Sequence, residues 1–233
     1  MACLRRLRQA CAIGIIGVAL LLVSPAAQVS AEGDQPTAQH RFDDVKYWSG
    51  VFDDPGRDVW QKPAALVAAL DLANGMTVAD LGAGTGYLSR RLSEAVGATG
   101  TVLAVEVEPN LLDHLRERAE HEGSTNLVPI LASADNPRLP RQIVDVVLVV
   151  DTYHHIGGRV DYFRRLREAV RPAGRVAIVD WRKEPLPVGP PPDHKVAREQ
   201  VVDEMGRAGY ALVESPDVLP YQYLLIFRPE RPD

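Results

Sequence analysis

The fold of this chain is decided by the stretch Asp80-Leu81-Gly82-Ala83-Gly84-Thr85-Gly86-Tyr87. It overlaps a predicted β-strand at residues 77–81 and leads into a predicted helix at residues 87–96. A strand that turns through glycines into a helix exposes backbone N–H groups at the helix N-terminus, and the missing Cβ atoms let a ligand approach the main chain. The stretch therefore predicts an α/β fold with a ligand site at this turn, formed by Gly82, Ala83, Gly84 and Gly86.

The glycine spacing and the acid before it indicate the chemistry of that ligand. The pattern is G-x-G-x-G, and Tyr87 stands where a dinucleotide-binding G-x-G-x-x-G would have its last glycine. A carboxylate at Asp80 would repel a pyrophosphate, but it can hold a cationic amino group directly or through water. A zwitterionic ligand, like the methionine end of S-adenosylmethionine, is therefore expected, and a nicotinamide-dependent oxidoreductase is disfavoured.

Strand-like and helix-like segments alternate along most of the chain. Residues 143–150 are an almost unbroken run of β-branched side chains, which is typical of a strand buried on both faces of a parallel sheet. A turn is expected at residues 172–174, and a Pro-rich loop at residues 184–193. Predicted strands lie at residues 77–81, 101–105, 127–131, 143–150 and 175–181, and predicted helices at residues 64–72, 87–96, 109–122, 160–170 and 195–208.

The C-terminal part breaks this alternation. Residues 211–214 and 221–227 predict two more strands, and the connection between them is too short for a crossover helix. Parallel neighbours need such a crossover, so these two strands should pair antiparallel. The expected fold is α/β: a Rossmann-like, open seven-stranded sheet that is mostly parallel, with an antiparallel last strand and helices on both faces.

Acids at the ends of the second and third strands are candidates for holding the rest of an adenosyl ligand. Glu106 closes the second strand about twenty residues beyond the glycines, where an acid commonly meets a ribose, and Glu108 is a lower-ranked alternative. Asp135 follows the third strand, where its carboxylate could accept a hydrogen bond from an adenine amino group while Ala134 supplies backbone. The alternative for Asp135 is a turn residue before Pro137.

The end of the fourth strand carries the cluster Asp151-Thr152-Tyr153-His154-His155. The strand end places this cluster beside the glycine turn, so Asp151 could face the sulfonium and amino groups of the ligand or a second substrate. Asp151, His154 and His155 are the candidates for a general base, since the unperturbed pKa of histidine suits proton transfer near neutrality. No third ligand with suitable spacing accompanies the two histidines, so no metal site is predicted. The alternative is that both histidines only pack and form hydrogen bonds.

Residues 42–63, before the first predicted helix, are aromatic and charged. These aromatic rings either seal one edge of the sheet or form a lid that excludes water from the ligand. The lid is favoured because the segment can lie across the strand ends, and Arg57 and Lys62 are expected at the surface or in ion pairs. The aromatic side chains are Phe42, Tyr47, Trp48, Phe52 and Trp60.

Residues 1–31 have the layout of a secretory signal peptide. Basic residues precede an apolar run at residues 10–23, which is shorter than the ~20 residues that span a bilayer. Cleavage is expected after Ala31, with Ala27 as the alternative, and the mature protein would be periplasmic or secreted. The other possibility is an uncleaved leader that anchors the chain to the inner membrane.

The expected organisation is a signal peptide at residues 1–31, a lead-in and possible lid at residues 32–63, and the ligand-binding domain at residues 64–233. Both cysteines lie in the leader, so a cleaved chain would have no thiols for disulfides or metal. The net charge of −5 provides no global basic field for nucleic acid, and nucleic acid is not an expected partner.

Over residues 60–228 the sequence resembles the class I S-adenosylmethionine-dependent methyltransferases. The resemblance rests on residues 78–87, 105–112 and 144–156. It implies S-adenosyl-L-methionine as the cofactor, places Asp135 at the family's adenine-side acid, and places His155 near a histidine found in many small-molecule methyltransferases. Bacterial exported methyltransferase-like proteins are similar also in the segments at residues 52–63 and 185–192.

Two functions are consistent with these features. The first is an S-adenosylmethionine-dependent methyltransferase that acts on a small-molecule or lipid-like acceptor and touches a membrane only through an uncleaved leader. The second is a non-catalytic exported module with a methyltransferase fold that binds adenosyl ligands or a protein. Formation of demethylated cofactor would separate the two.

Overall fold

The computed structural model describes residues 36, 42 and 44–230. They belong to one compact unit at residues 32–233, and the predicted signal peptide lies outside the described residues. Within the described part, no helix is both long enough and apolar enough to cross a membrane.

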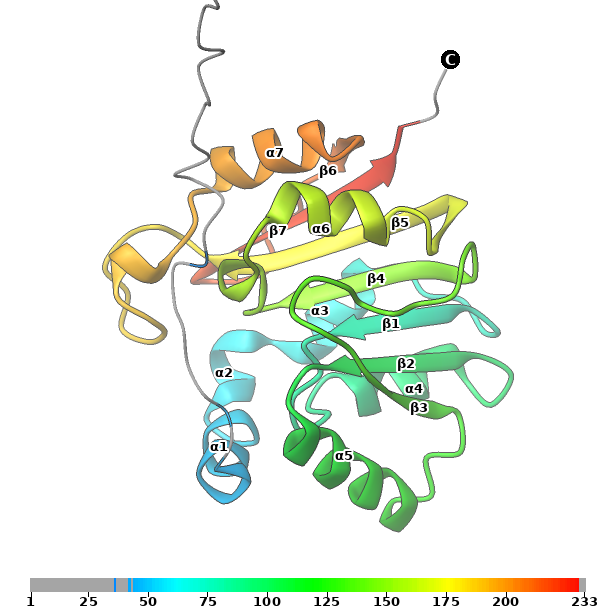
Figure 1. Cartoon of the computed structure of the whole chain (residues 1–233). Coiled ribbons are helices and arrows are strands. Elements are labelled where there is room, and N and C mark those ends of the chain that lie inside the picture. The colour runs from blue at the N-terminus through cyan, green and yellow to red at the C-terminus, as the bar shows by residue number, and fades with distance from the viewer. Residues whose placement is uncertain (1–35, 37–41, 43, 231–233) are drawn as a thin grey trace, which may run out of the picture. The chain divides into compact units, whose positions relative to one another are not determined.

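One sheet with the strand order β3-β2-β1-β4-β5-β7-β6 forms the centre of this unit (Figure 1). Strands β1 to β5 pair in parallel, whereas β7 pairs antiparallel with both β5 and β6. The predicted fold class is therefore confirmed, including the reversed last strand. The strands are β1 (Thr77–Leu81), β2 (Thr101–Glu106), β3 (Leu127–Leu131), β4 (Val144–Val150), β5 (Val170–Trp181), β6 (Tyr210–Glu214) and β7 (Gln222–Pro229).

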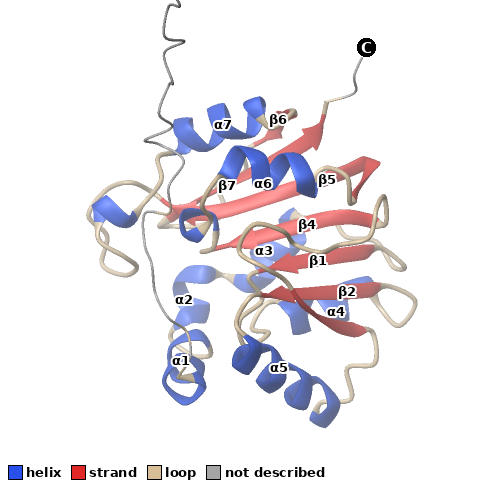
Figure 2. Cartoon of the chain, in the orientation of Figure 1, coloured by secondary structure: helices blue, strands red, loops and turns tan. Residues whose placement is uncertain are grey.

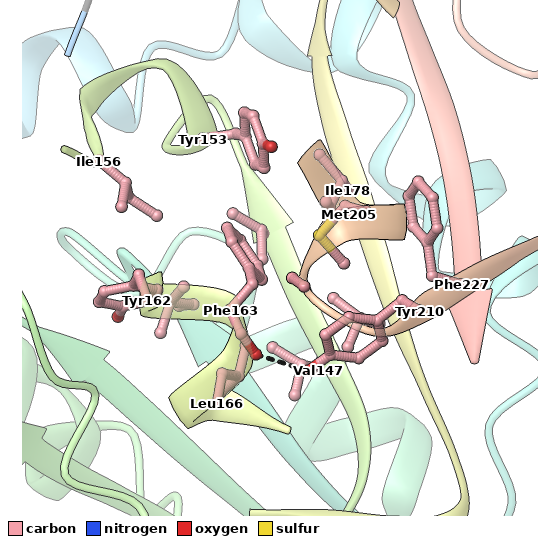
Figure 3. Close-up of a cluster of buried hydrophobic side chains, with 14 of the residues drawn as sticks. Val147, Tyr153, Ile156, Tyr162, Phe163, Leu166, Ile178, Met205, Tyr210 and Phe227 are labelled. Atoms are coloured by element: carbon pink, nitrogen blue, oxygen red, sulfur yellow. Dashed lines mark hydrogen bonds between the residues drawn. The ribbon is translucent and has the colours of Figure 1, made fainter. Parts of the chain in front are cut away.

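Helices cover both faces of the sheet (Figure 2). Helices α3 and α4 pack on one face through Leu66 and Leu92, and α6 and α7 pack on the other through Phe163 and Met205 (Figure 3). Helix α5 packs on β2 and β3 through Leu115. The α-helices are α1 (Val45–Phe52), α2 (Arg57–Gln61), α3 (Pro63–Ala69), α4 (Ser89–Val96), α5 (Pro109–His121), α6 (Arg159–Leu166) and α7 (Arg198–Arg207), and the 3₁₀ turns are η1 (Tyr153–His155) and η2 (Pro192–His194).

Strand β4 explains why the central strands are apolar at nearly every position. Val147 and Val149 belong to the core cluster under α6 and α7, whereas Val146 and Leu148 belong to the cluster under α3 and α4. Side chains alternate between the two faces along a strand, so a strand covered on both faces needs apolar residues throughout. The strand order reverses between β1 and β4, and the C-terminal ends of these strands therefore flank a crevice.

The predicted turn at residues 172–174 is wrong. Helix α6 ends at Leu166, and β5 already begins at Val170. Val144 of β4 pairs with Val170 of β5, and the next pair is Val146 with Arg175, so β5 has extra residues between these two positions. The extra residues of β5 form a bulge, a feature whose local proline and glycine content resembles that of a turn.

Candidate functional site

A cavity of about 510 Å³ opens at the C-terminal ends of β1, β2 and β4. The glycine turn at residues 82–85 forms part of its wall, and α1 and α2 contribute rings from the side of the N-terminal segment. Most of the surface that lines it is apolar. Of the predicted site residues, Asp80, Gly82, Ala83, Gly84, Glu106, Ala134, Asp151, His154 and His155 line this cavity.

The glycine turn is tightly packed from both sides. Gly82 has a φ of +77°, and a Cβ at this position would collide with the side chain of Thr152 at the end of β4. Gly84 has a φ of +56°, and its Cβ would lie 3.3 Å from the ring of Phe52 in α1. Both positions therefore need glycine for conformation, and Gly82 needs it for space as well. Gly86 does not line the cavity and packs against Leu115 instead.

Asp80 is a buried carboxylate at the end of β1. It accepts a hydrogen bond of 2.6 Å from the hydroxyl of Ser89, the first residue of α4. Burial raises the pKa of Asp80 to about 6, against the opposing effects of the Ser89 hydrogen bond and of the Arg57 charge. A cation that reaches this carboxylate would stabilise its ionised form.

Glu106 connects the end of β2 to the glycine turn. Its Oε2 accepts a hydrogen bond of 2.8 Å from the backbone N–H of Gly84, and its Oε1 accepts from the N–H groups of Val107 and Glu108. Burial raises the pKa of Glu106, although these three hydrogen bonds favour the ionised form. Glu108, the lower-ranked candidate, is the N-cap residue of α5 and does not line the cavity.

Asp135 lies beside the cavity and does not line it, whereas Ser133 and Ala134 do. Its carboxylate accepts a hydrogen bond of 2.8 Å from the Ser133 hydroxyl, which lowers the pKa of Asp135. A backbone bridge joins Ser133 to Asn136 across a tight turn. The structure thus gives Asp135 the geometry of a turn residue, and its contact with an adenine stays a prediction.

Asp151 links the core to the N-terminal segment. Its Oδ2 lies 3.3 Å from Nη2 of Arg57, and its Oδ1 accepts a hydrogen bond from Nε2 of Gln222 at the start of β7. Asp151 has a φ of +53°, a strained conformation for a residue with a side chain. Burial raises the pKa of Asp151 to about 7, with Arg57 opposing the rise. The cavity therefore contains a second carboxyl that titrates near neutrality.

The two histidines of η1 have different surroundings. The His154 side chain is 4 % exposed, and its Nδ1 lies 2.9 Å from Oδ1 of Asp180, a fully buried residue of β5. His155 is partly exposed, and its ring lies edge-on to Phe42 at 5.6 Å between centroids. The ring centroids of the two histidines are 4.1 Å apart. Within the described residues, no group of three or more histidines, cysteines or acids is placed to hold a metal ion.

The segment at residues 42–63 lies over the cavity rather than along an edge of the sheet. Phe42, Trp48 and Phe52 contact one another and line the cavity, as does Trp60, whose ring lies 5.0 Å from that of Trp181. That this segment acts as a lid stays a prediction. The outer rings differ, since Tyr47 is 60 % exposed and packs only on Trp48 among the described rings.

Three charged side chains of this lid segment bind three different core elements. Asp53 pairs with Arg118 of α5 at 2.8 Å, and Arg118 also donates to the carbonyl oxygen of Thr85 in the glycine turn. Asp58 pairs with Arg91 of α4 and accepts a hydrogen bond from the Tyr87 hydroxyl. Together with the Arg57–Asp151 pair, these contacts hold the lid against the site. Lys62, by contrast, is exposed, as expected.

Three residues of the site were not assigned from the sequence, and a fourth lies in a place that the sequence analysis did not predict. Arg57 was expected at the surface or in an ion pair, and it is paired but lies in the cavity wall. Asp180 and Gln222 contribute from the end of β5 and the start of β7, and their positions at strand ends were the available signal. Thr85, within the glycine turn, is fully buried, and its hydroxyl has no hydrogen-bond partner among the described residues.

Comparisons with known proteins agree with this geometry. Residues 78–174 match a family model described as a methyltransferase domain. A solved structure, described as a SAM dependent methyltransferase from Aquifex aeolicus, matches with a TM-score of 0.75 and 26 % identity, over 81 % of this chain and 98 % of that one. These matches support a class I S-adenosylmethionine-dependent methyltransferase. The cofactor of this methyltransferase family is S-adenosyl-L-methionine.

Other proteins similar to this chain differ in their named activities. The ubiquinone/menaquinone biosynthesis C-methyltransferase UbiE of Burkholderia vietnamiensis is 29 % identical over 125 residues, covering 53 % of this chain and 51 % of the relative. The chain thus spans about half the length of the curated relatives it matches. The [4+2]-cyclase SpnF has the same fold, with a TM-score of 0.63 and 13 % identity over 74 % of this chain and 82 % of that one.

Proposed function

We propose that this chain transfers a methyl group from S-adenosyl-L-methionine to a small-molecule or lipid-like acceptor. The observation that supports this most directly is the composition of one cavity. The glycine turn, Asp80 and Glu106 line the same space as the polar groups Asp151 and His154 and the rings of the lid. One cavity therefore offers a cradle for a zwitterionic nucleoside together with room for an apolar partner.

The residues of the turn fit the cofactor. Asp80 can hold the ammonium group, and the buried Thr85 hydroxyl without a partner can donate to the carboxylate. Glu106 can accept from the ribose hydroxyls if Gly84 N–H turns to the ligand, and Ala134 can contribute backbone beside the adenine. The bound cofactor supplies an activated methyl group, and the protein supplies alignment, which can contribute roughly 7–11 kcal/mol.

The acceptor side of the cavity favours an apolar, ring-bearing molecule. Phe42, Trp48, Phe52 and Trp60 present aromatic faces to it, and such faces stack on flat ligands. The UbiE relatives are named for ubiquinone and menaquinone biosynthesis, whose molecules combine a ring with a lipid-like tail, and this supports the same class of acceptor. The lid, which carries these rings, would exclude water during transfer.

Calorimetry with S-adenosylhomocysteine tests the cofactor part of the proposal. We expect micromolar binding to the wild-type protein and no detectable binding to Gly84→Val, because a valine there has an unfavourable φ and crowds the ligand cradle. Gly123→Val is the matched control: its φ is +70° and it has open space around it, away from the cavity. Intact binding by Gly84→Val, or equal loss in the control, would count against the proposal.

Turnover separates the enzyme from a binding module with the same fold. The fold alone does not decide, since a named cyclase shares it. We expect the protein to form S-adenosylhomocysteine from S-adenosylmethionine when a cell-envelope extract supplies the acceptor. Binding without any turnover across such extracts would favour the non-catalytic module.

A further inference from the structure

Asp180 and His154 form a buried pair at the wall of the cavity. Both oxygens of the Asp180 carboxylate lie within hydrogen-bond distance of Nδ1 of His154, at 2.9 and 3.0 Å. The same carboxylate accepts hydrogen bonds from the backbone N–H groups of His154, at 3.2 Å, and Trp181, at 2.8 Å. One carboxylate thus fixes the ring of His154, the start of the η1 turn and the end of β5.

This contact decides how the imidazole can act. An anionic acceptor at Nδ1 favours the tautomer that carries its proton on Nδ1, so the lone pair lies on Nε2. His154 also lines the cavity, next to the predicted position of the acceptor. The ring therefore combines a fixed orientation with the capacity to accept one proton at a defined atom.

Charged groups on three elements act on this ring. Burial by itself would lower the pKa of His154, but Asp180 on β5 outweighs burial and the pKa is raised. Asp151 at the end of β4 adds to the rise, and Arg159 on α6 opposes it. The protonated ring is thus stabilised by an adjacent carboxylate, as a general base requires.

The other two candidates for the base have different contacts. Both oxygens of Asp151 are engaged, one by Arg57 of the lid and one by Gln222 of β7. His155 is partly exposed and packs its ring between Phe42 and His154. These contacts suit Asp151 to holding the lid and His155 to shaping the apolar wall.

We propose that His154 is the general base of the reaction and that Asp180 is the positioning residue that sets its tautomer and orientation. The inference rests on the proposed function and specifies its acceptor as one that must lose a proton, a hydroxyl being the simplest case. The hydroxyl proton passes to Nε2 of His154, the electron pair of the O–H bond forms the new oxygen–carbon bond, and the electron pair of the carbon–sulfur bond leaves on sulfur.

Nitrogen NMR of histidine-labelled protein tests the dyad without any acceptor. With His154→Gln used for assignment, we expect the neutral His154 ring to carry its proton on Nδ1. Asp180→Asn should lower the titration midpoint of His154 by roughly one pH unit. Asp217→Asn, which removes an exposed carboxylate paired with Arg182, is the matched control and should leave the midpoint unchanged. A wild-type ring protonated on Nε2 would overturn the proposal. This measurement does not use Asp180→Asn, so it tests the proposal even if that variant does not fold.

Turnover then tests the role of the dyad. His154→Gln should reduce S-adenosylhomocysteine formation by roughly 10²–10⁴-fold, while its calorimetric affinity for S-adenosylhomocysteine stays within about three-fold of wild type. Asp180→Asn should shift the midpoint of the acid limb of the pH–rate profile to lower pH. Undiminished turnover in His154→Gln contradicts the dyad. Binding with no turnover in the wild type, or no S-adenosylhomocysteine binding by the wild type, contradicts the proposed function instead.

Discussion

Among single residues, Asp80 is the group through which pH should act on cofactor binding. Burial holds its pKa at about 6, and the charge that can meet a ligand ammonium is lost as the pH falls through that value. We expect the affinity for S-adenosylhomocysteine to fall roughly ten-fold between about pH 7.5 and pH 5, which is about 1.4 kcal/mol. Calorimetry across this range checks it, and Asp80→Asn should bind weakly with a flatter pH dependence. An equally steep dependence in that variant would assign the effect to another group.

Glu204 contributes to the stability of the fold rather than to cofactor binding. It accepts hydrogen bonds from Arg159, Tyr153 and Gln200 in a pair with Arg159 that is almost fully buried. Burial would raise the pKa of Glu204, but these hydrogen bonds outweigh burial and lower it. A lowered folded-state pKa stabilises the fold above the unfolded-state pKa, and that stabilisation is lost as the pH falls through the folded-state value.

Removing the Glu204 carboxylate should therefore be costly at neutral pH. Glu204→Ala removes the carboxylate that pairs with the buried Arg159 guanidinium, and we expect the free energy of unfolding to fall by roughly 3–5 kcal/mol. Chemical denaturation at about pH 7 measures this. The control is Glu199→Ala on the same helix, whose carboxylate is mostly exposed and makes only a long contact with Arg198. Equal effects in both variants would show that the buried pair is not the cause.

The residues that could be predicted from sequence are those fixed by a local motif. Asp80, Gly82, Gly84 and Glu106 all belong to the first strand–helix–strand unit, where spacing along the chain determines spacing in the fold. Asp180 and Gln222 could not be assigned in this way. They contact His154 and Asp151 in the cavity wall only because β5 lies next to β4 and β7 next to β5, a relation that involves distant parts of the sequence.

At the scale of elements, the lid depends on charged contacts more than on packing with the sheet. Helix α1 has no buried residue, and its flanking Asp53 binds Arg118 of α5. Partly exposed ion pairs contribute up to about 1 kcal/mol and are weakened by salt. The lid is therefore expected to be among the first elements to open.

Breaking the Asp53–Arg118 pair should make the lid open more often. For Asp53→Asn we expect S-adenosylhomocysteine to dissociate about 5-fold faster, the equivalent of roughly 1 kcal/mol. Protease cleavage within residues 45–61 should be faster as well. Stopped-flow kinetics and limited proteolysis measure the two effects. Asp113→Asn, which removes an exposed pair within α5, should change neither, and an unchanged dissociation rate in Asp53→Asn would show that this contact does not hold the lid.

Element boundaries show where local sequence patterns are insufficient. The strands at residues 77–81 and 127–131 were predicted to the residue, since apolar runs and flanking turns define them. Helices α3 and α7 are shorter than predicted, and the turn at residues 172–174 is a bulge within β5. A bulge is defined by its pairing with the neighbouring strand, and the local sequence of β5 does not contain that information.

At the scale of the whole molecule, the topology followed from a few physical rules. Alternating strands and helices imply parallel pairing, and a short final connection implies reversal of the last strand; both features are present.

Export of the protein remains a proposal. We expect the protein isolated from the cell envelope to begin at Glu32, as determined by mass spectrometry of its N-terminus. A protein that retains residues 1–31 in the membrane fraction would indicate an anchor instead.

The contact between Phe52 and the Gly84 turn has a consequence for the order of events in each catalytic cycle. The same ring lies over the cofactor turn and lines the acceptor side of the cavity. A single movement of α1 would thus open the cavity to both ligands, so that the cofactor and the acceptor would exchange in the same open state. Opening of α1 would then be a step that cofactor exchange and acceptor entry share.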